Sequence, residues 1–276
     1  MDPLDPFQAL VMGIVQGLTE FLPISSSAHL VLLPWLFGWR DPGLTFDVAL
    51  HIGTLFAVIG YFWRDWWQLV GGLGRSLSRR RLADDPQARM FWLLVIASVP
   101  GAVVGALAED AVESWLRAPA IIAALTIGLG LVLVLAEAIG SRDRLMKHLG
   151  LGDAILIGIS QALAVCPGVS RSGVTITTGL FRGLTRDAAA RFSFLMSTPI
   201  IAGAGLYNLR HLLTGGLPAD ERLGFAIGFT AAAVVGFLAI KLLLRYLQRN
   251  SLLVFAYYRF ALGALIFAVI LAGARG

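Results

Sequence analysis

The 276-residue chain is 57% hydrophobic and only 14% charged, and its mean hydropathy is +0.78. This composition excludes an ordinary soluble domain and indicates a polytopic membrane protein. The net charge of +5 comes mostly from arginines outside the apolar segments. Because no basic stripe alternates with aromatic residues, we expect no nucleic-acid partner. The single cysteine, Cys166, cannot form a disulfide within the chain.

The chain begins with an apolar segment that is too short to cross a bilayer comfortably. Residues 7–22 are apolar, but Pro23 ends the segment because proline donates no N–H and disfavours helical geometry in the residue before it. Ser25 or Ser26 can cap a second short helix over residues 27–38. Together the two short helices predict a re-entrant hairpin rather than a full span.

The rest of the chain alternates long apolar segments with polar loops. A second pair of short helices, 153–165 and 173–182, predicts another re-entrant hairpin. Residues 64–90 are expected to form the longest polar loop. Six segments are long and apolar enough to be predicted as full spans, namely 44–62, 91–108, 119–139, 192–207, 223–244 and 251–271.

An internal repeat with an offset of 145 residues relates the two hairpins. At this offset identical residues coincide: Gly13 with Gly158, Gln16 with Gln161, Ser25 with Ser170 and Ser27 with Ser172. We therefore predict an all-α polytopic membrane protein in which six full transmembrane helices and two re-entrant broken-helix hairpins form one membrane domain, residues 1–276. Its inverted repeats would span residues 7–135 and 152–271. Paired broken helices of this kind are typical of binding sites at the membrane midplane.

The charges of the loops predict the orientation. Segments 64–90, 140–150 and 245–250 are basic, whereas 109–118 carries three acidic residues and one arginine. Basic loops stay in the cytoplasm. The first hairpin should therefore open outward and the second inward, which makes the two copies inverted.

Polar residues at the two breaks predict an anion site. The second helix of each hairpin begins among serines, near Ser26 and near Ser172, where free N–H groups and the helix dipole favour negative charge. Arg171 adds a planar guanidinium that matches phosphate oxygens. Because inverted symmetry brings both helix starts toward one point, we expect a phosphate cradle there.

The first hairpin also carries acid–base groups. Gln16 and Glu20 lie four residues apart and share a helix face. Glu20 can act as a general base or bind a hard divalent cation with Gln16 as a neutral oxygen ligand. His29 lies on the first turn of the next helix, where it is positioned for proton transfer. Ser26 and Ser27 are candidate nucleophiles if a base lies within reach.

At these residues the chain resembles the undecaprenyl-diphosphate phosphatase family of bacterial membranes, the bacitracin-resistance type. The family pattern of Glu or Gln, three residues and then Glu appears as Gln16-Gly17-Leu18-Thr19-Glu20, followed by Phe21-Leu22-Pro23-Ile24-Ser25-Ser26-Ser27-Ala28-His29. The family's PGxSRSxxT motif stands as Pro167-Gly168-Val169-Ser170-Arg171-Ser172-Gly173-Val174-Thr175. The resemblance covers essentially the whole chain, including Tyr257-Tyr258-Arg259. One departure is Gln16, where many members have the first Glu.

The resemblance implies hydrolysis of undecaprenyl diphosphate to undecaprenyl phosphate and inorganic phosphate, which recycles the lipid carrier for peptidoglycan synthesis and confers bacitracin resistance. It implies a divalent cation, Mg²⁺ or Ca²⁺, held by Glu20 and Gln16. The site would open toward the outer face of the bacterial cytoplasmic (inner) membrane. By motif position it implies catalytic roles for Glu20, Ser26, His29 and Arg171, and substrate contacts for Ser25, Ser27, Ser170, Ser172, Thr175 and Arg259.

Several alternatives stay open at this point. A polyprenyl diphosphate and membrane lipid are the expected partners, and a homodimer is one assembly that the sequence allows. A secondary transporter or lipid flippase also uses inverted repeats with broken helices. The type-2 acid phosphatase superfamily relies on two histidines and a PSGH element, of which only the SR dipeptide is present. Either Ser26 or a water could attack, and His51 in segment 44–62 is interpreted as a packed polar partner.

Overall fold

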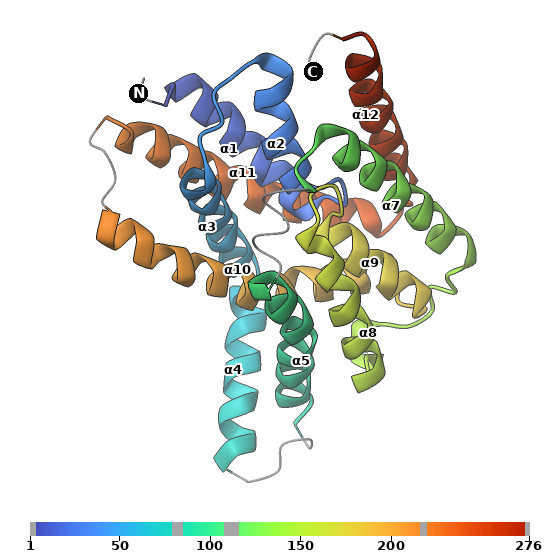
Figure 1. The fold of residues 1–276 in the computed structure, drawn as a ribbon. Coiled ribbons are helices and arrows are strands. Elements are labelled where there is room, and N and C mark those ends of the chain that lie inside the picture. Colours follow the sequence, from blue (N-terminus) through green and yellow to red (C-terminus); the bar gives the residue numbers. More distant parts are fainter. Residues whose placement is uncertain (1–3, 79–84, 108–115, 216–219, 274–276) are drawn as a thin grey trace.

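The computed structural model describes residues 4–78, 85–107, 116–215 and 220–273. Within these ranges the chain is helical, and an isolated bridge joins Arg144 to Leu184. Figure 1 shows the arrangement of the helices, which are α1 (Pro6–Phe21), α2 (Ser26–Phe37), α3 (Leu44–Tyr61), α4 (Trp63–Ser78), α5 (Pro86–Leu107), α7 (Pro119–Ile139), α8 (Leu151–Ala162), α9 (Arg171–Phe181), α10 (Arg186–Gly215), α11 (Arg222–Leu247) and α12 (Leu253–Leu271), with short 3₁₀ turns at Met146–His148 and Leu163–Val165.

Six helices in the described part of the chain are long and apolar enough to cross a membrane: α3, α5, α7, α10 over Arg186–Leu206, α11 and α12. They coincide with the six predicted spans, so the prediction of an all-α membrane protein with six full spans is confirmed. The helices α1, α2, α8 and α9 have 16, 12, 12 and 11 residues. Each is shorter than the roughly 20 residues that a span needs. Their lengths are consistent with two re-entrant hairpins.

The prediction of a polar loop over 64–90 is wrong for much of that segment. Residues Trp63–Ser78 form α4, and α5 already begins at Pro86. On α4 the buried residues Leu69, Gly72 and Ser76 recur every three or four positions, which is the helical period. This face packs against α5, and the two helices project together from the rest of the molecule (Figure 1). Residues 79–84, in the same predicted loop, lie outside the described residues.

The two hairpins pack on corresponding partners, since α1 crosses α11 and α8 crosses α5. Gly13 and Gly158, which the repeat aligns, lie at these two crossings. A Cβ atom at Gly13 would lie 2.4 Å from the Gly228 carbonyl oxygen, and one at Gly158 would lie 2.6 Å from the Ala97 carbonyl oxygen. Only glycine allows the backbones to approach so closely. The repeated glycine therefore sets the depth at which each hairpin meets its neighbour.

The buried core lies against the end of α1 that carries the first break. Phe21, the last residue of α1, is fully buried and contacts Phe194 of α10 edge to face, with ring centroids 5.3 Å apart. The second break is tied to the first by a hydrogen bond from the Gly168 N–H to Ser25 Oγ of 3.2 Å. Both breaks therefore meet near the centre of the helix bundle (Figure 1).

Candidate active site

The first break turns the chain sharply between α1 and α2. After Leu22 the helix cannot continue, because Pro23 has no N–H to donate. Ser25 then adopts a left-handed backbone with φ of 74°, and its hydroxyl caps α2 by accepting from the Ala28 N–H at 3.3 Å. A non-glycine residue in this region is strained, and such strain is concentrated at functional sites.

The second break uses a glycine for the same purpose. The 3₁₀ turn Leu163–Val165 follows α8, and Gly168 adopts φ of 97° before Ser170 caps α9 by accepting from the Gly173 N–H at 3.0 Å. Ser172 Oγ, on the first turn of α9, donates to the Leu22 carbonyl oxygen of the first break at 3.0 Å. Each break therefore supplies hydrogen bonds that hold the other in place.

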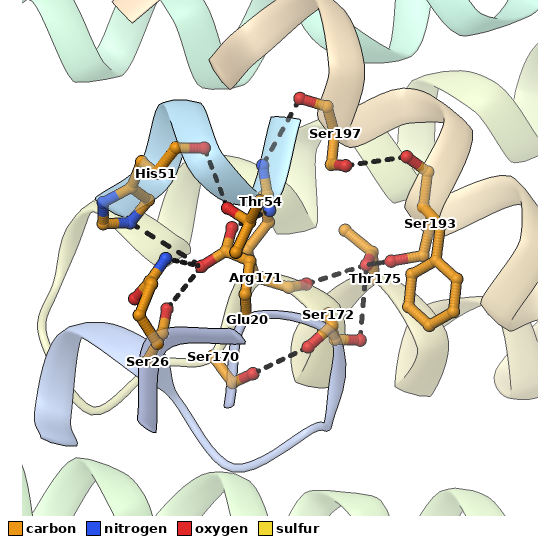
Figure 2. A network of polar contacts seen from close by, with 12 residues as sticks. Glu20, Ser26, His51, Thr54, Ser170, Arg171, Ser172, Thr175, Ser193 and Ser197 are labelled. Carbon is orange, nitrogen blue, oxygen red and sulfur yellow. Dashed lines mark hydrogen bonds and ion pairs between the residues drawn. The ribbon is translucent and has the colours of Figure 1, made fainter. Parts of the chain in front are cut away.

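An ion pair between Glu20 and Arg171 joins the two breaks, although the residues are 151 positions apart. Both side chains are largely buried, at 4% and 16% exposure. A buried pair of this kind needs further hydrogen bonds to offset the loss of hydration. Arg171 donates through Nη2 to Glu20 Oε1, and its Nη1 lies 3.5 Å from the Ser197 carbonyl oxygen of α10. Figure 2 shows this pair at the centre of a polar network.

The second oxygen of Glu20, Oε2, lies close to three further polar side chains. Glu20 Oε2 accepts a hydrogen bond from Ser26 Oγ at 2.6 Å and from Gln16 Nε2 at 3.0 Å. His51 Nε2, from α3, lies 3.6 Å from the same oxygen (Figure 2). The carboxylate thus touches a hydroxyl that could lose its proton, and the short Ser26 contact is the arrangement expected of a base and its nucleophile.

Serine and threonine hydroxyls form a second, connected part of the network on α9 and α10. Ser170 Oγ and Ser172 Oγ lie 3.1 Å apart, and Thr175 Oγ1 lies 2.7 Å from Ser193 Oγ. Thr175 also donates to the Arg171 carbonyl oxygen at 2.7 Å. These contacts fix the first turns of α9 and hold Arg171 against Glu20 (Figure 2).

His29 lies outside the Glu20 network. Its Nδ1 lies 2.6 Å from the Ser25 carbonyl oxygen, and its Nε2 lies 2.7 Å from the Tyr258 hydroxyl, with the two rings stacked. Since a carbonyl oxygen only accepts, Nδ1 carries the proton and the Tyr258 hydroxyl donates to Nε2. Among the described residues, therefore, His29 has both nitrogens engaged away from Glu20 and Arg171. The proton-transfer role predicted for His29 stays a prediction.

Arg259 is fully buried and holds three backbone segments together. Its guanidinium donates to the carbonyl oxygens of Thr126 at 2.9 Å, Pro23 at 3.1 Å and Gly168 at 2.7 Å. Pro23 and Gly168 belong to the two breaks, so Arg259 fixes their separation. These bonds use three of the five N–H groups of the guanidinium. The contact with substrate that the resemblance implies for Arg259 stays a prediction.

The structure brings together most of the predicted residues. Glu20, Gln16, Ser26 and Arg171 are in direct contact, while Ser25 and Ser27 lie next to them with their hydroxyls 3.2 Å apart. Sequence reasoning missed the roles of Tyr258, Ser193, Ser197 and the direct contact of His51 with the carboxylate. A polar residue inside an apolar span was the available signal for His51.

The fold and this site define a class of protein: a multi-pass helical membrane protein with a buried acid, hydroxyl and guanidinium between two broken helices. The family described as Bacitracin resistance protein BacA matches residues 9–265, and the chain belongs to this family. The chain is 55% identical to the undecaprenyl-diphosphatase of Moorella thermoacetica over 95% of this chain and 97% of the relative. It is 53% identical to that of Desulforudis audaxviator, over 97% and 99% of the two chains. With the enzyme of that name from Thermomicrobium roseum it shares 50% identity, over 97% and 99%.

Proposed function

We propose that this protein hydrolyses undecaprenyl diphosphate to undecaprenyl phosphate and inorganic phosphate. The names of its relatives give the substrate. The contact that carries the proposal is the one between Ser26 Oγ and Glu20 Oε2, beside the Arg171 guanidinium. Phosphoryl transfer by this route requires three groups of the protein: a hydroxyl nucleophile, a base, and a positively charged side chain that binds phosphate, here Arg171.

The geometry supports a mechanism in which Ser26 is the nucleophile. Glu20 accepts the proton of Ser26 while Oγ attacks the terminal phosphorus, and the bond between that phosphorus and the bridging oxygen breaks. This releases undecaprenyl phosphate and leaves a phosphoserine, which water then hydrolyses. Arg171 has five N–H donors in a planar fork and stabilises the charge on the transferred phosphoryl group. The N-termini of α2 and α9 favour the same negative charge.

The divalent cation that the resemblance implies is compatible with the residues of the first break. Gln16 Oε1 is a buried oxygen without a hydrogen-bond partner in the described part of the chain, and it belongs to the residue that contacts Glu20. An amide oxygen and a carboxylate, completed by substrate phosphate oxygens, are ligands suited to a divalent cation. Gln16 and Glu20 would hold the cation. When bound, it would neutralise charge on the diphosphate.

The experiment for the proposed function is phosphate release from undecaprenyl diphosphate by the purified protein in detergent. Ser26→Ala should abolish turnover, whereas Ser78→Ala, which removes an exposed hydroxyl at the end of α4 outside the site, should leave it unchanged. If Ser26→Ala keeps normal turnover, a water attacks instead. If the wild-type protein releases no phosphate, the hydrolase proposal is wrong and the secondary transporter or lipid flippase becomes the better account, since a pure transporter does not cleave its cargo.

We further propose that the protein lies in the bacterial cytoplasmic membrane with the first hairpin opening outward, as its basic loops predict. A cysteine at Gly43, introduced after Cys166→Ser, should react with an impermeant thiol reagent added outside intact cells. A cysteine at position 80, which lies outside the described residues, should be protected. The reverse labelling pattern would place the opening of the first hairpin in the cytoplasm.

A further inference from the structure

The two charged groups at the centre of the site are enclosed. The side chains of Glu20 and Arg171 are 4% and 16% exposed, and they are paired with each other. A diphosphate headgroup can therefore contact both only after a segment that covers them has moved. Movement of a covering segment is a common step in enzymes whose reacting groups are shielded from water. The two hairpins differ in how easily such a movement could occur.

The difference lies at the mouth of each hairpin, which is the end away from the break, where the first helix starts and the second helix ends. The two mouths lie on opposite sides of the breaks (Figure 1). Their backbones correspond at the repeat offset of 145 residues, since α1 begins at Pro6 and α8 at Leu151. The aligned glycines Gly38 and Gly183, with left-handed φ of 66° and 76°, follow α2 and α9. The side chains at aligned positions can therefore be compared directly.

A buried ion pair joins the mouth of the second hairpin. Asp153, in the first turn of α8, accepts a hydrogen bond at 2.7 Å from Nε of Arg182, the residue that caps the end of α9. Arg144 donates to both carboxylate oxygens of Asp153, at 3.2 Å and 2.7 Å, and to the Arg182 carbonyl oxygen at 2.6 Å. The Asp153 side chain is only 3% exposed. Separating α8 from α9 here would take a partner away from a buried charge, which is strongly destabilising.

In the first hairpin the aligned positions hold an amide and a phenyl ring, Gln8 and Phe37, instead of the carboxylate and the guanidinium. Gln8 Nε2 donates to the Arg40 carbonyl oxygen at 2.7 Å. Phe37 is exposed and stacks on Trp39, with ring centroids 5.2 Å apart, and Trp39 contacts Phe7 edge to face. A neutral hydrogen bond and aromatic contacts can be broken and remade without leaving a buried charge unpaired.

We propose that the mouth of the first hairpin is the gate of the site: α1 and α2 separate there to admit the lipid diphosphate and release the product, while Asp153 and Arg182 keep the second mouth closed. Pro34, inside α2, removes a backbone hydrogen bond and gives this helix a point at which it can bend. By contrast, α9 packs against α7, α8 and α10. The inference rests on the proposed function, which names the substrate. It also separates a hydrolase from a transporter, because a transporter must open its site to each side in turn.

The experiment exchanges the side chains of the two mouths in the purified full-length protein in detergent and follows amide hydrogen exchange by mass spectrometry. In the wild type, amides at the end of α2 should exchange about 10-fold or more faster than those at the end of α9, after correction for intrinsic rates. The double variant Gln8→Asp/Phe37→Arg transfers the ion pair to the first mouth. It should slow exchange at the end of α2 by about 10-fold and lower phosphate release from undecaprenyl diphosphate by a similar factor.

The matched controls carry half of the transferred pair. Gln8→Asp alone and Phe37→Arg alone each add one charge without its partner, so neither should slow exchange at the end of α2. The reverse exchange, Asp153→Gln/Arg182→Phe, should speed exchange at the end of α9 and leave phosphate release unchanged. The transferred pair tests the gate even if this reverse variant fails to fold, because it adds an interaction to an intact protein.

Two results would overturn the inference. One is equal or slower exchange at the first mouth than at the second in the wild type. The other is a transferred pair that slows exchange at the end of α2 but leaves phosphate release at the wild-type rate, since the substrate would then enter elsewhere. A wild-type protein that shows the expected exchange difference but releases no phosphate would contradict the proposed function alone.

Discussion

Each of the two helix breaks contains a residue with a positive φ, but the residue type differs between them. Gly168 adopts its left-handed φ of 97° without strain, whereas Ser25 adopts φ of 74° at a cost of order 1–3 kcal/mol. A glycine at position 25 would relieve this strain. It could not accept the hydrogen bonds that Ser25 Oγ receives from the Gly168 and Ala28 N–H groups. The strained residue thus ties the first break to the second.

The side chains beside the breaks differ in charge. The first break has Glu20 before it and Ser26 after it, while the second is followed at once by Arg171. A lone charge buried at this depth would be strongly destabilising, but the two breaks together bury a neutral pair. The comparison teaches that a repeated backbone provides two equivalent positions, and that opposite substitutions in the two copies turn them into one site.

The largest expected loss of activity comes from changing Arg171 or Glu20, the two opposite charges that the breaks bring together. Arg171→Lys keeps the charge but loses the planar fork, so we expect kcat/KM for phosphate release to fall by roughly 10²-fold or more. The kcat/KM of the Glu20→Gln variant should fall at least as far, because the amide cannot take the proton of Ser26. Circular dichroism of both variants should show that helix content is retained. Near wild-type turnover in Arg171→Lys would exclude a bidentate phosphate contact.

An intermediate effect is expected where the two breaks differ in backbone. Gly168→Ala places a Cβ atom 2.7 Å from the Ile122 carbonyl oxygen at a positive φ, so we expect a loss of about 2–4 kcal/mol in stability. The readout is the thermal unfolding midpoint in detergent. Gly152→Ala is the matched control in α8, where an added Cβ has nothing within 4 Å, and it should be neutral or slightly stabilising. Equal midpoints for the two variants would contradict the assigned role of Gly168.

The smallest effect concerns His29, which belongs to the first break alone. Tyr258→Phe removes the hydroxyl that donates to His29 Nε2. Losing this hydrogen bond should cost ~1 kcal/mol, which corresponds to a fall in kcat/KM of less than tenfold. Phosphate-release kinetics on the purified variant would measure it. A loss of more than a hundredfold would show that the His29–Tyr258 pair takes part in the chemistry, as the sequence predicted for His29.

Much of the fold was predictable because its causes are local. Bilayer thickness sets the length of a span, so the six apolar segments were found from hydropathy alone. Pro23 ends the first helix through its own backbone chemistry, which located the first break, and the internal repeat related the second break to it. The helix α4 was missed because its apolar residues follow the helical period within a segment that is polar on average. Averaging over a window hides such a pattern.

The sequence by itself determined the membrane class, the two breaks and the residue types that meet there. Only the tertiary structure decided which of these residues touch one another, because they come from distant segments of the chain. It paired Glu20 with Arg171 across 151 residues and directed His51 at the same carboxylate. It also directed Arg259 at three backbone carbonyl oxygens. A motif fixes which groups are present, but the docking of the helices fixes which free donors and acceptors remain for a ligand.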